Sequence, residues 1–107
     1  MKQHRYRVSV EHLCDAKGEP SSYSAPLSFE TGNHDDIFSV VERVRRDSGL
    51  PQDTATALAV GLKLFGEVLL ENRDHPLFEA FAPHFGEFMK HLKKTLKANA
   101  AEAQAAE

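Results

Sequence analysis

The stretch LSFETGNHDDIFSVVERV, residues 27–44, contains the point at which the spacing of apolar residues changes. Its first part alternates apolar and polar side chains, which is the pattern of a half-buried β-strand. Its last part repeats apolar residues at the spacing of one face of an α-helix. The residues of that face are Ile37, Val40, Val41 and Val44. The sequence therefore predicts a strand that gives way to a helix within this stretch.

A β-hairpin is predicted on the N-terminal side. Residues 5–13 (RYRVSVEHL) and 22–30 (SYSAPLSFE) both alternate, and residues 14–21 between them have a turn composition. Pro26 lacks an N–H group, so we expect an edge or a bulge there. Because a lone two-stranded hairpin is marginal in water, its apolar side is expected to pack on helices. Its open edges lead to a further hypothesis, a homodimer formed by strand pairing.

Three helices are predicted on the C-terminal side. The first ends at Gly49, and the second runs from Pro51, or shortly after it, to about Asn72. The third begins near Pro76 and is expected to kink or loosen at Pro83 and Gly86. The second helix also carries a strip of small residues that would let another element approach closely. This strip consists of Ala55, Ala59 and Gly66.

The predicted fold class is α+β, with an N-terminal antiparallel β-hairpin packed on three α-helices in the order β-β-α-α-α. One domain is expected over residues 1–97, because no linker interrupts that range. Residues 98–107 (ANAAEAQAAE) lack an apolar stripe. We expect this tail to continue the helix and to fray.

The charge balance and the apolar content of the chain weigh against some classes of function. The chain has 107 residues, 16 acidic and 13 basic, for a net charge of −3. A basic excess is usual in nucleic-acid binders, so this balance weighs against nucleic acid as a partner. No apolar run approaches the roughly 20 residues needed to cross a bilayer, and the N-terminus has no apolar signal region. We therefore expect a cytoplasmic protein without a membrane partner. Cys14 is the single cysteine, so no internal disulfide can form.

The first candidate site lies at residues 33–36, where a histidine and two aspartates follow an asparagine. Asn33 is a strong N-cap type, and His34, Asp35 and Asp36 would then be the first three helical residues. Both aspartates would also meet the positive end of the helix dipole. The structural interpretation is a helix start, and the functional alternative is a ligand site at these four residues.

The second candidate site is the turn between the second and third helices. Asn72, Arg73, Asp74 and His75 precede Pro76 there. The residue before proline avoids helical angles, so a chain reversal explains the composition. The functional alternative is a polar knuckle that contacts a partner, or that binds an anion if both helix starts lie at one end of the bundle.

Other charged groups are interpreted as solvated helix faces. His84, Glu87 and His91 share one flank, but the spacing is not that of two histidines four residues apart in a tight zinc site. We predict no metal and no cofactor. Catalytic motifs such as a glycine-rich phosphate loop or a Gly-x-Ser-x-Gly elbow are missing, so an enzyme is not favoured and no catalytic residue is assigned.

Several segments resemble a small family described only as domain of unknown function 3861. They are NHDDIF, ALAVGLKLFGEVLLENRDHPLFEAF and HFGEFMKHLKK, with KQHRYRVSVEHL and PLSFETGNHDDI before them. The resemblance extends from residue 1 to about residue 95. It implies a single α+β domain in a bacterial cytoplasm. It implies no activity and no functional residue.

Two functional hypotheses follow. The first is a non-catalytic interaction or accessory module with an unidentified protein partner. The second is a small-molecule or anion-binding domain, enzymatic or not, that uses residues 33–36 and the turn at residues 72–75. The second requires that Asp36 and His75 lie close together around a concave pocket.

Overall fold

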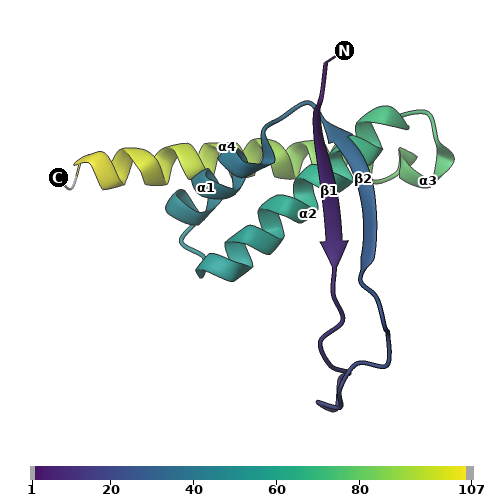
Figure 1. Cartoon of the computed structure of the whole chain (residues 1–107). Helices are drawn as coiled ribbons and strands as arrows, with labels where there is room; N and C mark the ends of the chain where they lie inside the picture. The colour runs from purple at the N-terminus through teal and green to yellow at the C-terminus, as the bar shows by residue number, and fades with distance from the viewer. Residues whose placement is uncertain (1, 106–107) are drawn as a thin grey trace. The chain divides into compact units, whose positions relative to one another are not determined.

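The computed structural model describes residues 2–105 and contains two compact units, residues 1–34 and residues 35–107. The first unit holds strands β1 (His4–Val10) and β2 (Leu27–Asn33). The second holds helices α1 (Ile37–Asp47), α2 (Gln52–Glu71), α3 (Pro76–Glu79) and α4 (Ala82–Ala105) (Figure 1). The α+β class and the order of a hairpin followed by helices are confirmed.

The hairpin pairs β1 with β2 in antiparallel register. Val8 faces Phe29 and Val10 faces Leu27, so the apolar residues of the two strands share one side of the sheet. The opposite side carries the Arg7–Glu30 ion pair, 2.9 Å between Nη2 and Oε2. These are the only strands in the described part of the chain, so each has one edge without a strand neighbour. The homodimer through a strand edge stays a prediction.

The second strand lies further along the chain than residues 22–30. It begins immediately after Pro26, where the missing N–H of proline removes no bond from the ladder. It extends to Asn33 because the first residues of β1 pair with Thr31, Gly32 and Asn33. The predicted turn at residues 14–21 is confirmed. Asp15 Oδ1 accepts N–H groups from Lys17 and Glu19, and Gly18 has the positive φ of 87° that favours glycine.

Helix α1 begins three residues later than predicted. Its N-cap is Asp36, whose carboxylate accepts the backbone N–H groups of Phe38 and Ser39. The prediction that Asn33 caps this helix is wrong because Asn33 belongs to β2. The predicted end is confirmed: Gly49, with φ of 80°, follows the C-cap Ser48.

The core of the second unit is small and depends on the strip of small residues in α2. Ala55 and Ala59 are fully buried against Val44 of α1 and Leu96 of α4. Because both alanines are completely excluded from solvent, a larger side chain at either position would have to displace its neighbours. A Cβ atom added to Gly66 would lie 3.5 Å from Cζ of Phe85 in α4. The predicted close approach is thus supported at Ala55 and Ala59, whereas a methyl group at Gly66 would make an ordinary van der Waals contact, so this position does not require glycine.

The predicted third helix begins at Pro76 as expected and is interrupted just before Pro83, one of the two positions where a kink was expected, so the chain forms α3 and α4; α4 continues through Gly86 without a break. Residues 80 and 81 lie in a turn between them. Pro83 cannot donate a hydrogen bond to the carbonyl of Glu79, and its ring clashes with that carbonyl in a continuous helix. The helix therefore restarts at Ala82, which places Pro83 in its first turn, where an N–H group has no helical partner.

A hydrogen bond joins helix α4 to the end of α1. The side chain of Asn99 donates to the backbone oxygen of Asp47 at 2.8 Å. The Asp47 carboxylate is buried and accepts two hydrogen bonds from Arg46, which raises the pKa of the Arg46 guanidinium. Helix α4 thus makes a tertiary contact two residues beyond the boundary at residue 97. The fraying of the tail stays a prediction.

The two units are described separately, so the single domain over residues 1–97 and the packing of the hairpin on the helices also stay predictions. Among the described residues, no helix combines the length and the apolar character that a membrane span requires.

Candidate functional site

An open groove between the end of α2 and the start of α4 is the candidate site. Its volume is about 380 Å³. We call it the α2–α4 groove, and it is lined by Gly66, Leu69, Leu70, Arg73, Ala82, Phe85 and Gly86. All of these residues belong to the second unit. The lining is apolar except for Arg73.

Both helices contribute a glycine to the lining of the groove. Gly66 comes from the middle of α2, and a Cβ atom at Gly86 of α4 would have no heavy atom of another group within 4 Å. Glycine inside a helix costs about 1 kcal/mol relative to alanine. The two glycines therefore leave space at a cost to helix stability.

Aromatic rings pack beside the groove and fix its walls. Phe65 of α2 lies with its ring centroid 6.1 Å from Phe78, 5.9 Å from Phe81 and 5.2 Å from Phe85. Edge-to-face and tilted pairs at these distances are favourable. The break at Pro83 contributes to this arrangement, because Phe78 comes from α3, Phe81 from the turn and Phe85 from α4. The aromatic cluster thus holds three short segments around Phe65.

Arg73 supplies the charge of the groove. It follows Asn72, the C-cap of α2, whose side chain donates to the backbone oxygen of Val68 at 2.7 Å and ends the helix. Arg73 is exposed and forms no ion pair with a residue in the described range. A guanidinium with this exposure is able to bind a carboxylate in a bidentate manner.

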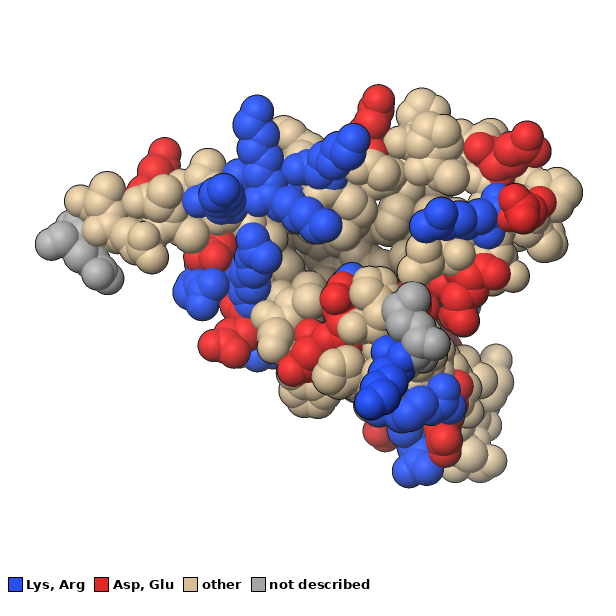
Figure 2. Space-filling model, turned by 90° about the horizontal axis from the view of Figure 1, so that it is seen from above, with Lys and Arg blue, Asp and Glu red and all other residues tan. Residues whose placement is uncertain are grey.

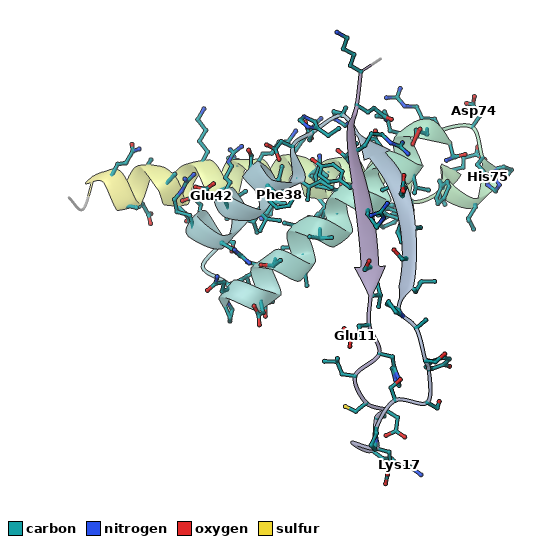
Figure 3. All side chains as sticks on the ribbon, viewed as in Figure 1. Glu11, Lys17, Phe38, Glu42, Asp74 and His75 are labelled. Carbon is teal, nitrogen blue, oxygen red and sulfur yellow. The ribbon has the colours of Figure 1, made fainter. Side chains whose placement is uncertain are left out.

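His75 has a structural role. Its Nδ1 accepts the backbone N–H of Leu77 at 3.1 Å, so His75 caps α3. This bond requires Nδ1 to be unprotonated. Asp74 and His75 are exposed at the α3 end of the molecule, where Figure 3 labels them, and neither lines the α2–α4 groove. Of the turn at residues 72–75, only Arg73 reaches that groove.

The residues of the first candidate site are distributed among different roles. Asn33 is buried at the end of β2 and His34 is exposed. The Asp35 carboxylate pairs with Lys63 of α2, and Asp36 caps α1. Neither Asp36 nor His75 lines the α2–α4 groove or the groove between α1 and α2, and each caps a separate helix. Figure 3 shows Phe38, two residues after Asp36, well separated from His75.

A second groove, with a volume of about 620 Å³, lies between α1 and α2. We call it the α1–α2 groove. Its lining consists of Ile37, Phe38, Ser39, Val41, Glu42, Arg45, Thr56 and Val60. Arg45 spans the two helices, since its Nε donates to Thr56 Oγ1 at 2.7 Å. Thr56 in turn donates to the backbone oxygen of Gln52.

The remaining charged groups lie on exposed helix surfaces. Figure 2 shows lysine and arginine side chains gathered over the middle of α4, where Lys90, Lys93, Lys94 and Lys97 are exposed. His84, Glu87 and His91 are exposed on another flank of α4. Within residues 2–105, no three His, Cys, Asp or Glu side chains lie close enough to hold a metal ion.

Sequence reasoning found part of this site. Arg73 was a candidate because of its polar neighbours, and Gly66 was singled out as a point of close approach. Leu70, Ala82 and Gly86 were missed as lining residues. The sequence signal for this groove was a pair of glycines, one in each of two predicted helices. Each glycine weakens its helix, and no turn at its position explains it.

Comparison with known proteins identifies the family. A search of curated proteins finds no match to the chain. The crystal structure of a protein of unknown function from Pectobacterium atrosepticum is similar, with a TM-score of 0.74 and 38% sequence identity. The similarity covers 87% of this chain and 99% of that one. The model of a domain of unknown function with a solved structure, DUF3861, matches residues 4–94. This chain therefore belongs to the domain of unknown function 3861 family.

Proposed function

We propose that this chain is a non-catalytic protein-interaction module. The α2–α4 groove receives an apolar side chain of a protein partner, and Arg73 binds a carboxylate beside that side chain. The observation that carries the proposal is the combination of an apolar groove, lined in part by two glycines, with an arginine that has no ion-pair partner in the described range.

The size of the groove favours a side chain over a whole small-molecule ligand. Its 380 Å³ lies near the lower end of the roughly 300–1,000 Å³ of ligand pockets, and the groove is open. Pockets that serve catalysis or cofactor binding place several polar groups around the ligand. This groove offers a single charged side chain. An apolar anchor with one charged neighbour fits that lining.

The charge of Arg73 determines how the partner is oriented in the groove. A planar guanidinium matches a carboxylate with two parallel hydrogen bonds. An exposed pair of this kind adds more to orientation and partner choice than to affinity. The apolar groove therefore supplies most of the binding energy, and Arg73 selects partners with an acidic residue or a chain terminus near the anchor.

The alternative, a small-molecule or anion site at helix N-termini, has no observation of its own to favour it. The side chains of Asp36 and His75 already accept backbone N–H groups of their own helices. We therefore retain the interaction module as the proposed function.

A selection from a random peptide library displayed on phage tests the proposal without a known partner. Selected peptides should combine an apolar residue with an adjacent carboxylate, and their affinity should fall when Arg73 is replaced by glutamate. Arg43→Glu is the matched control, because Arg43 is an exposed arginine that lines neither groove. Peptides that bind both variants equally, or a selection without enrichment, would contradict the proposal.

A further inference from the structure

We infer that the α1–α2 groove is the contact surface between two copies of this chain, related by a two-fold axis. This inference goes beyond the proposed function, because it uses a different groove and a different partner. In the dimer, Phe38 of each copy enters the groove of the other copy, and Glu42 of each copy pairs with Arg45 of the other.

The exposed side chain of Phe38 lies at the edge of the α1–α2 groove. Phe38 is 75% exposed, the highest value among the large apolar residues of the second unit. It lines a groove of about 620 Å³ whose other apolar residues include Val41 and Val60. A symmetric interface requires one surface to be complementary to itself. An exposed phenylalanine at the edge of an apolar groove of this volume meets that requirement.

An acidic and a basic side chain, Glu42 and Arg45, lie along the same edge of the groove. Glu42 and Arg45 are separated by three positions on α1, so their side chains project from the same side of the helix. When two such helices run antiparallel, the acid of each faces the base of the other. Thr56 Oγ1 accepts the Nε hydrogen of Arg45, and that bond restrains the guanidinium at the lining of the groove. One acid and one base on one face are therefore self-complementary under two-fold symmetry.

The size of the surface predicts a weak dimer. Phe38 exposes on the order of 150 Å², taking about 200 Å² for a whole phenylalanine. A stable interface buries about 800 Å² on each partner. The eight residues of the groove lining are fewer than the roughly 20 residues per side of a standard interface. We therefore expect reversible association that depends on protein concentration.

Sedimentation velocity of the full chain over a concentration series tests the inference. Wild type should change from monomer to dimer as concentration rises. Phe38→Ala should weaken the dimer at least about tenfold, as expected when a central aromatic anchor is truncated. Leu77→Ala is the control, because Leu77 is 73% exposed on α3 and lines neither groove. Circular dichroism establishes that each variant is folded.

Charge reversal tests the symmetry itself. Glu42→Arg alone places arginine opposite arginine, and Arg45→Glu alone places glutamate opposite glutamate, so each variant should remain monomeric at concentrations where wild type dimerises. An equimolar mixture of the two variants should dimerise, because every pair across the axis is then of opposite charge. A wild type that stays monomeric, a dimer that Phe38→Ala weakens no more than Leu77→Ala, or a mixture that stays monomeric would each overturn the inference.

Discussion

Replacing Asp36 with alanine should destabilise the second unit by about 1 kcal/mol, within the range of about 0.5–2 kcal/mol for loss of an N-cap. Asp36 Oδ1 accepts the backbone N–H of Phe38 at 3.0 Å and that of Ser39 at 3.4 Å. Its Oδ2 accepts the hydroxyl of Ser39 at 3.1 Å. Because these donors are exposed, water replaces the lost bonds, and the loss stays far below the full strength of three hydrogen bonds.

Two variants separate the geometry of the cap from its charge. Asp36→Asn keeps a side-chain oxygen in the same place and should retain most of the stability, since asparagine is as good an N-cap as aspartate. Asp53→Ala removes a carboxylate from the first turn of α2, where no side chain caps the helix. Only the dipole interaction of Asp53 is lost, about 0.3–1 kcal/mol at low salt, and that loss should shrink as salt is added.

Urea unfolding followed by far-ultraviolet circular dichroism measures these differences at low and high salt. A loss of 1 kcal/mol corresponds to roughly 4 °C in the melting temperature of a domain of about 100 residues. The reasoning fails if Asp36→Asn is as destabilising as Asp36→Ala, because charge rather than cap geometry would then dominate. A gain in stability for Asp36→Ala would contradict the cap role of Asp36 altogether, since it would indicate that the carboxylate is kept for ligand binding at a cost to stability.

Three further changes test the packing of the second unit. Ala59→Leu should cost about 1–3 kcal/mol in urea unfolding because Ala59 is fully buried, while Ala57→Leu on the exposed side of α2 should cost less than about 0.5 kcal/mol. A chain that ends at Lys97 should be less stable than one that ends at Ala100, because only the longer chain keeps the Asn99–Asp47 hydrogen bond. The expected difference in the free energy of unfolding is about 1 kcal/mol, the usual contribution of one hydrogen bond, and equal melting curves would contradict this. A double-mutant cycle with Asp35→Asn and Lys63→Met should give a coupling energy of about 1 kcal/mol for their ion pair, and a value near zero would show that the pair contributes nothing.

Periodicity was sufficient to predict the class of fold and most helix boundaries. The apolar stripe of α2 is long. Gly49 and Pro51 precede the helix and Pro76 follows it, so its bounds were predicted to within a residue or two. Gly49 was recognised as the end of α1 from its type alone, and its φ of 80° explains why that inference works. Local conformational preference decides these positions, and the sequence displays it directly.

The start of α1 was predicted wrongly because a distant partner decides it. Asn33 and Asp36 are equally good N-caps, so local preference cannot choose between them. The choice depends on β1, whose first residues pair with Thr31, Gly32 and Asn33 and keep them extended. An antiparallel register that joins residues about 27 positions apart is not visible in the spacing of either strand. The same limit explains why β2 was placed too early in the chain.

The candidate site was harder to predict than the fold because apolar residues build most of it. A search for functional chemistry selects polar clusters, and here Asp36 and His75 prove to be helix caps. The α2–α4 groove depends instead on where Pro83 restarts the chain and on two glycines in different helices. Arg73 becomes informative only beside that groove, since an exposed arginine in a turn is ordinary by itself. In the proposed interaction module, the apolar lining would give room for an anchor and Arg73 would select the partner, and neither property alone would distinguish an interaction site from a helix turn.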